Sequence, residues 1–303
     1  RFNGVSARII DRPAEDATRK WVELVSTEAD LSSVMQAMRD LPIGNGRRGF
    51  RNAVTRALKQ ARLHGGAGIV LGVRDGRLMS EPIDEDAILA LEWVMVLSGC
   101  ELLPISYIVD PESPNFGAVR QYSMLTEVSS VGGSGRFSGG VTVHGSRVIP
   151  FEGNFVSRLK CLSNDPYGWP DSIYYRIYRE LVNVGVVEDA GARTVLEKNI
   201  PVLKMSGLAA LMGTEGGEAK VRARMRIISA CKSILNMLLL DKDDTFEYKD
   251  ASLSGLARLL DIYPNRVSAV SGIPMTLLYG TSPGGLNATG ESDVTFYYDG
   301  VEG

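Results

Sequence analysis

Two glycine-rich stretches are the first places in this sequence where a phosphate could bind. They are Gly65-Gly66-Ala67-Gly68 and Gly132-Gly133-Ser134-Gly135. A dinucleotide-binding loop follows a strand and opens a helix, because the phosphate lies on the helix N-terminus. The first stretch instead ends a predicted helix and opens a predicted strand, and no G-x-x-x-x-G-K-[ST] motif occurs. The sequence therefore predicts no nucleotide cofactor.

Metal ligands and nucleophiles are equally sparse. His64 and His144 are the only histidines, and both are far in sequence from the three cysteines, which include no C-x-x-C. Neither a zinc site nor a disulfide framework is predicted. The run 241–245 resembles the start of a calcium loop, but Phe246 and Ser252 stand where an EF-hand needs Gly and Glu. No G-x-S-x-G elbow occurs either, so we predict no catalytic, cofactor-binding or metal-binding residue.

A row of basic residues occupies every second position of one predicted helix. Its members are Lys220, Arg222, Arg224 and Arg226. Alternate spacing spreads such a row over more than one helical face. It could be a solvated surface beside flanking carboxylates, or it could meet an acidic partner, a neighbouring subunit or passing phosphates.

The composition is that of a folded protein that does not grip DNA. The 303 residues are 44 % apolar and 23 % charged, with a net charge of −3. Proteins that hold many phosphates are usually basic, so either nucleic acid is no partner of this chain or it passes by without being held. No apolar run is long enough to span a membrane. Because there is no initiator Met and the chain stops inside a predicted helix, we expect a fragment of a longer protein.

Residues 1 to about 150 predict a mixed domain of helices and strands. A longer helix should begin at Asn45 or Gly46 and end at Gly65. The alternating run 69–73, then Asp75-Gly76, then 77–79 predict a β-hairpin, since Asp-Gly favours a type I′ turn. Further strands are predicted at 93–97, 102–109, 120–125 and 141–151.

The second half predicts two long helices around a small insert. The first is capped by Asp171 or Ser172. The insert, 201–250, should hold a short strand, a helix, and a hairpin made by 237–240 and 245–249. The second helix, from about 253, contains Pro264, which should kink it by removing a hydrogen bond and clashing with the preceding turn.

The last fifth of the chain carries the most specific pattern. After the second long helix come Ser271-Gly272-Ile273-Pro274-Met275-Thr276 and Leu278-Tyr279-Gly280, then the run 282–293, and then Tyr297-Tyr298-Asp299. These residues resemble the portal proteins of tailed phages, in the branch common in prophages, and the resemblance extends over nearly the whole chain. It implies a subunit of the ring at one capsid vertex through which DNA is packaged and ejected.

The resemblance implies an α+β portal protein fold, with a mixed α/β wing, two long stem helices, a small α/β clip insert and a tunnel loop. The implied boundaries are 1–170 for the wing, 171–200 and 251–279 for the stem helices, 201–250 for the clip, and 280–303 for the tunnel loop and the start of a returning helix. Pro264 would then set the angle between stem and loop. The tunnel loop would face DNA with small, uncharged residues: Thr281, Ser282, Pro283, Gly284, Gly285, Leu286, Asn287, Ala288 and Thr289.

The resemblance also implies partners. The chain would form a closed ring, usually of twelve copies, around double-stranded DNA. The clip would dock the terminase large subunit and the head–tail adaptor, and the ring would contact the major capsid or scaffolding protein in the virion, after assembly in the bacterial cytoplasm. No membrane and no enzyme activity are expected. Two alternatives stay open: a ring-forming adaptor that does not conduct DNA, and a nucleic-acid-processing enzyme.

Overall fold

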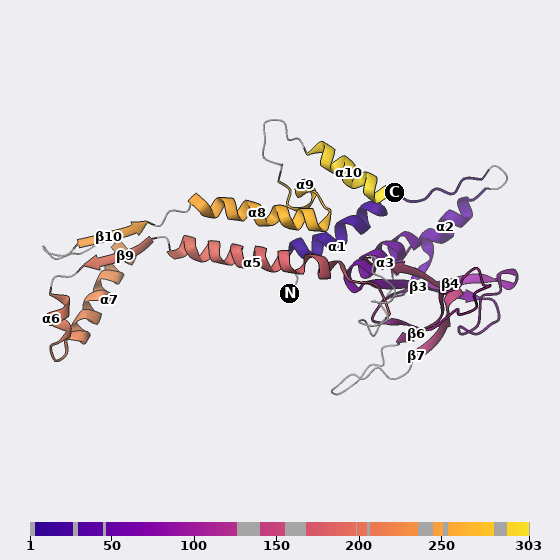
Figure 1. Ribbon diagram of the computed structural model, residues 1–303, viewed down its shortest axis with the longest axis horizontal. Helices are drawn as coiled ribbons and strands as arrows, with labels where there is room; N and C mark the ends of the chain where they lie inside the picture. The colour runs from indigo at the N-terminus through magenta and orange to yellow at the C-terminus, as the bar shows by residue number, and fades with distance from the viewer. Residues whose placement is uncertain are drawn as a thin grey trace. The chain divides into compact units, whose positions relative to one another are not determined.

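The structure is a computed structural model that describes residues 4–26, 30–44, 47–125, 140–154, 168–197, 199–204, 207–235, 245–250, 254–281 and 290–302. The chain mixes helices and sheets, as predicted, and divides into two compact units (Figure 1). The first unit is Arg1–Val182 with Pro264–Gly303, and the second is Asn183–Tyr263. In the described part, no helix combines the length and apolar character needed to cross a membrane.

Two sheets form the centre of the first unit. The five-stranded sheet has the order β2-β1-β4-β3-β8 and the three-stranded sheet the order β5-β6-β7. Their strands are β1 (Pro42–Ile43), β2 (Arg47–Arg48), β3 (Gly66–Arg74), β4 (Ala90–Ser98), β5 (Leu102–Tyr107), β6 (Val119–Leu125), β7 (Gly140–His144) and β8 (Val148–Glu152). The helices wholly within this unit are α1 (Gly4–Ala17), α2 (Ser32–Asp40), α3 (Phe50–His64), α9 (Met275–Leu278) and α10 (Glu291–Glu302).

The alternation of side chains along β3 gives this unit two cores. Ile69 packs on one face with Ala53 and Ala57 of α3, because successive strand residues point to opposite sides of a sheet. Val70 points to the other face and packs with residues of the three-stranded sheet. Alanines on the buried side of α3 let the helix lie close to the sheet. The five-stranded sheet is therefore covered by α3 on one face and partly by the second sheet on the other.

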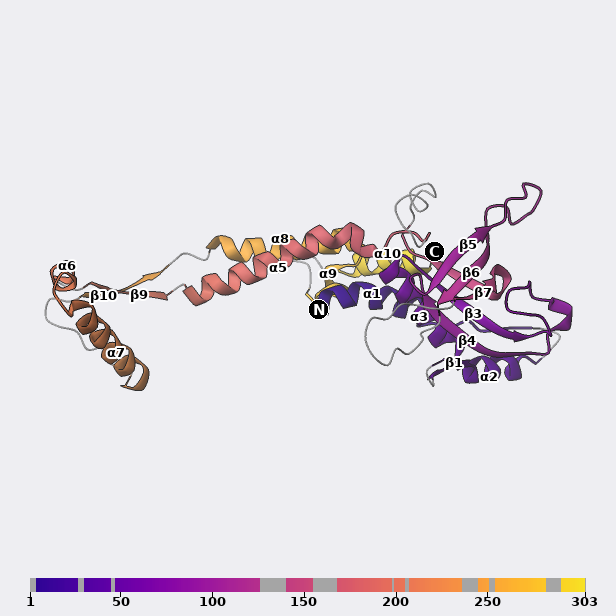
Figure 2. The ribbon, with the colours of Figure 1, turned by 90° about the horizontal axis from the view of Figure 1, so that it is seen from below.

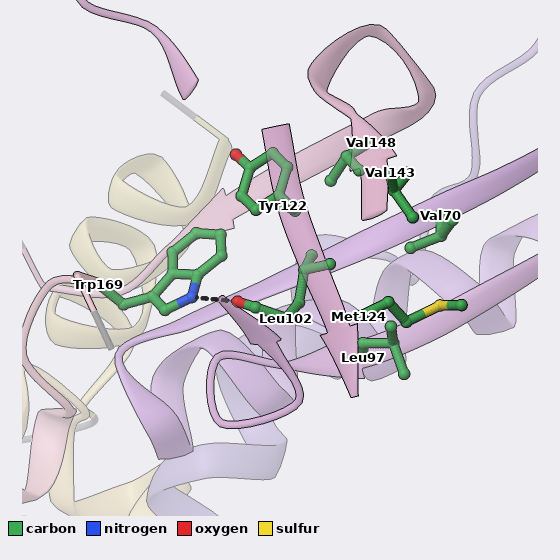
Figure 3. Close-up of a cluster of buried hydrophobic side chains, with 8 residues drawn as sticks. All are labelled: Val70, Leu97, Leu102, Tyr122, Met124, Val143, Val148 and Trp169. Atoms are coloured by element: carbon green, nitrogen blue, oxygen red, sulfur yellow. Dashed lines mark hydrogen bonds between the residues drawn. The ribbon is translucent and has the colours of Figure 1, made fainter. Parts of the chain in front are cut away.

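Trp169 lies in the segment just before helix α5 (Ile173–Glu197) and completes the second core. Its indole is 4 % exposed and donates a hydrogen bond of 2.7 Å from Nε1 to the carbonyl oxygen of Leu102 (Figure 3). The ring also stacks on Tyr122, with centroids 6.0 Å apart. Burial raises the pKa of Tyr122 to about 12. A buried indole that satisfies its own N–H fixes the path of the chain at this point.

The first glycine-rich stretch makes room for this segment. A Cβ atom on Gly66 would lie 2.2 Å from the Trp169 ring, and one on Gly65 would lie 1.9 Å from the carbonyl oxygen of Pro170. Gly65 also has φ of 83° at the end of α3, a conformation that favours glycine. These glycines therefore serve close backbone packing.

The predicted hairpin around Asp75-Gly76 is wrong. Strand β3 pairs with β4 and β8, and residues 77–79 form no strand. Asp75 is turned inward, where it pairs with the buried Arg147 at 2.7 Å and accepts the backbone N–H groups of Arg77 and Asp84. Burial alone would raise the pKa of Asp75, but these N–H groups and the guanidinium together lower it. The carboxylate organises a loop in place of a type I′ turn.

Three further boundaries differ from the predictions. Helix α3 begins at Phe50, not at residue 45 or 46, because Arg47–Arg48 forms a short strand with β1. The single strand predicted over 141–151 is two strands in different sheets, separated by a 3-10 turn at Gly145–Arg147. The strand predicted at 245–249 exists, but it pairs with Asn199–Lys204. Its predicted partner, 237–240, lies outside the described residues.

The second unit contains a two-stranded ribbon and a helix pair. The ribbon joins β9 (Asn199–Lys204) to β10 (Thr245–Asp250) in antiparallel register. Between them along the chain lie α6 (Leu208–Met212) and α7 (Gly217–Leu235), which contact each other (Figure 2). Two long helices, α5 (Ile173–Glu197) and α8 (Ser254–Ser271), each run through a boundary between the units. Both were predicted from their apolar periodicity and caps.

We expect Gly66 and Trp169 to be strongly coupled in stability. Trp169→Ala should lower the free energy of unfolding by about 3–5 kcal/mol, because it removes a buried aromatic ring. Gly66→Ala should also destabilise, since its Cβ would meet that ring. In the double variant, Gly66→Ala should lower the free energy of unfolding little further than Trp169→Ala alone, because the indole ring that its Cβ would meet is absent. Urea unfolding measures all four proteins, and Phe116→Ala, at an exposed aromatic residue, is the control. Additive effects would contradict this packing.

Candidate functional site

The predicted basic row lies on α7, in the second unit. Lys220, Arg222 and Arg226 are exposed and Arg224 is half-buried. Arg222 forms an ion pair with Glu218, one helical turn earlier. The ion pair of Arg222 is what the alternative of a solvated surface predicts. The exposed side chains of the row nevertheless remain accessible to a partner.

Exposed apolar side chains accompany the basic row. Met225 and Ile227 of α7 and Met212 at the end of α6 are all about half exposed. Methionine is adaptable, and exposed apolar groups beside charges are typical of protein-binding surfaces. The α6–α7 pair thus offers basic and apolar groups together, which are suited to an acidic protein surface more than to a duplex backbone.

The other predicted site residues are Pro264 and the residues of the tunnel loop, 281–289. Thr281 is exposed, and residues 282–289 of the predicted tunnel loop lie outside the described residues. Pro264 lies inside α8, which stays helical from Ser254 to Ser271, and the two compact units meet in sequence between Tyr263 and Pro264. The kink at Pro264 and the role of the loop remain predictions.

The residues that follow α8 pack inside the first unit. Ile273 and Leu278 are each 1 % exposed, and the Ser268 hydroxyl donates a hydrogen bond of 2.6 Å to the carbonyl oxygen of Ile273. Pro274 precedes α9. In the last turn of α9, the carbonyl oxygen of Leu278 accepts a hydrogen bond from the guanidinium of Arg8 in α1. The segment 271–280 is therefore a compact corner held against α1.

Helix α10 returns to α1 through a polar cluster (Figure 1). Asp16 of α1 accepts hydrogen bonds from Arg12 at 2.7 Å and from the Tyr297 hydroxyl at 3.2 Å. Arg12 also donates to the Tyr298 hydroxyl at 3.2 Å, and the guanidinium of Arg19 lies 5.1 Å from the Tyr298 ring centroid. Burial, and then the negative charge of Asp16, raise the pKa of Tyr297, so its hydroxyl stays a donor at neutral pH.

This cluster was not foreseen from the sequence. Tyr297 and Tyr298 belong to the sequence pattern noted above, but their partners on α1 are about 280 residues earlier in the chain. Burial lowers the pKa of His64 and of His144. Within the described residues, no three His, Cys, Asp or Glu side chains gather as a metal site requires.

A family model described as phage portal protein matches residues 1–303. This chain belongs to the phage portal protein family. The portal fold is also found in a chain from the neck of a native gene transfer agent particle, computed with C12 symmetry. That chain is 14 % identical to this one and superposes with a TM-score of 0.56, over 98 % of this chain and 72 % of its own length.

Two relatives carry a different name. An "Anti-CBASS protein Acb1" from Caulobacter sp. (strain RHG1) is 33 % identical over 99 % of this portal-family chain, and one from Sphingomonas paeninsulae is 28 % identical over 99 %. This chain spans about half of their length, 47 % in each case. Their name therefore describes proteins about twice as long as the matched part.

We expect Tyr297→Phe to loosen α10 from α1. The variant loses the hydrogen bond to Asp16, which is worth about 1 kcal/mol, so amide hydrogens of α10 should exchange about fivefold faster. Hydrogen exchange measured by mass spectrometry would report the change. Phe296→Leu, at a neighbouring side chain that is 75 % exposed, is the matched control. Equal exchange in the Tyr297→Phe variant and the wild type would show that the cluster does not hold the helix.

Proposed function

We propose that this chain is a subunit of a portal ring, the conduit for DNA at one vertex of a phage-type capsid. The observation that carries the proposal is the family match over all 303 residues. The likeness to the neck chain supports the same fold and no more, because it is only 14 % identical. The ring would be closed by head-to-tail contacts and, from the family resemblance, would have twelve subunits.

The chemistry of the segment 281–289 supports the proposal of a conduit. Its nine residues include no Lys, Arg, Asp or Glu, so a loop of this composition around a channel would let a polyanion slide without being held. The net charge of −3 points the same way. In this proposal α5 and α8 are the stem helices, and the residues between them form the clip, which docks the terminase large subunit and the head–tail adaptor.

A second candidate function is the one named in the two relatives. The 33 % identity to an anti-CBASS protein favours it, but about half of that relative lies outside the match. If the role belonged to the matched part, this chain expressed alone would have to reproduce the anti-CBASS effect in cells that carry CBASS. A ring-forming adaptor with no open channel is another alternative, and channel width separates it from a conduit. A nucleic-acid-processing enzyme is also an alternative, and a nuclease or ATPase assay separates it from both.

We expect this protein to form closed rings. Electron microscopy and native mass spectrometry of the same sample should show one ring size, with the loops 281–289 around a hole wide enough for duplex DNA. A hole too narrow for a duplex would support the non-conducting adaptor. A compact dimer with the loop buried would refute the portal assignment.

The basic row on α7 should act in docking and not in ring assembly. Arg222→Glu/Arg226→Glu should leave ring size unchanged and slow association with the terminase or adaptor about tenfold at low salt, because long-range attraction to an acidic partner is lost. Surface plasmon resonance across a salt series would measure this effect. Arg193→Glu, at an exposed arginine of α5, is the matched control. An association rate independent of the row, or rings that fail to form, would argue against a docking role.

A further inference from the structure

An exposed apolar arm follows α1. Residues 21–26, Trp-Val-Glu-Leu-Val-Ser, form neither helix nor strand. Val22, Leu24 and Val25 are 58 %, 40 % and 86 % exposed. Neighbouring apolar side chains that stay in contact with water in this way mark a surface that is covered by something else, because burying them is favourable. We call residues 21–26 the arm.

An open groove of about 610 Å³ lies beside the base of the arm, between the end of α1, helix α2 and the start of α3. Trp21 and Phe50 meet edge to face in it, with ring centroids 6.3 Å apart, and Met35 and Met38 of α2 add flexible apolar surface. Three arginines, Arg39, Arg48 and Arg51, also line it. An apolar floor with cationic sides suits a segment that combines apolar side chains with a carboxylate.

The positive charge of the groove is not neutralised within the described part of the chain. No carboxylate there forms an ion pair with the three arginines. The groove's own Glu15 is held by Lys59 at 2.6 Å. Helix α3 adds to the positive potential, since its first turn has no acidic residue and its N-cap, Gly49, has no capping side chain. A carboxylate brought from outside would therefore be stabilised here.

We propose that the arm of one subunit docks in this groove of the next subunit around the ring. The arm carries the chemistry that the groove would bind, because Glu23 stands between Val22 and Leu24. Within one chain Trp21 already belongs to the groove, while Val22, Leu24 and Val25 extend into solvent. Every subunit has one arm and one groove, so the contact is head to tail and can close a ring. This inference rests on the proposed function.

The test uses two variants of the full-length protein. The arm variant is Val22→Ser/Leu24→Ser/Val25→Ser, and the groove variant is Arg48→Glu/Arg51→Glu, which places acidic groups at a helix N-terminus that tolerates them. Native mass spectrometry over a concentration series should show each variant alone needing about tenfold more protein than the wild type for half-maximal ring assembly. Val109→Ser/Arg120→Glu, at exposed positions of the same unit, should assemble like the wild type.

Mixing the two variants gives the decisive result. The groove variant keeps an intact arm and the arm variant keeps an intact groove. A mixture of the two should therefore contain heterodimers at a concentration at which neither variant alone forms homodimers. No heterodimer, or variants that assemble at the wild-type concentration, would overturn the inference and leave the portal function standing. If the wild type and both variants form rings normally, but the variants no longer bind another protein, the groove belongs to that other protein. This result would also overturn the inference. Failure of the wild type to form any ring would instead count against the proposed function.

Discussion

The packing of the Trp169 indole on the bare backbone of Gly66 determines how the first unit is connected. At this point the end of α3, the start of β3 and the end of β8 come together, because the carbonyl oxygen of Gly65 accepts the N–H of Gly153 at 2.8 Å. The carbonyl oxygen of Pro170 lies so close to Gly65 that a Cβ atom on that residue would clash with it. The chain then has one direction in which to begin α5. A core tryptophan and two glycines thus fix where the first long helix leaves the sheets.

From that start, the elements that define the family resemblance converge on α1. The Tyr174 hydroxyl in the first turn of α5 donates to the carbonyl oxygen of Ser6, α9 approaches through Leu278, and α10 binds through Asp16. Ile9 in the middle of α1 is fully buried. The residues 271–280 are therefore specific in sequence because they form a tightly packed corner. Together with α10, they hold the two ends of the segment 281–289 on the same unit.

Local signals were enough to predict the mixed fold, the long helices and most strands. Caps, glycine stops and apolar periodicity act within a few residues, and a single sequence contains them. The errors arose where a distant residue decides the local structure. Asp75-Gly76 has the composition of a hairpin turn, but Arg147, 72 residues later, turns the carboxylate inward. The apolar arm was missed for a related reason: nothing local in the sequence indicates that no other element covers Val22, Leu24 and Val25.

A portal subunit must bind its neighbours firmly and DNA weakly, and the distribution of charge in this chain is consistent with that requirement. Two basic groups of α3 are engaged with protein: Lys59 pairs with Asp11 and Glu15, and Arg62 donates to the carbonyl oxygen of Ile9. The basic row of α7 lies beside exposed methionine and isoleucine. A cation flanked by apolar groups discriminates in favour of a protein partner, because the apolar contact gains nothing from a phosphate backbone. In the proposed conduit, a net negative chain would use its arginines for assembly without retaining DNA.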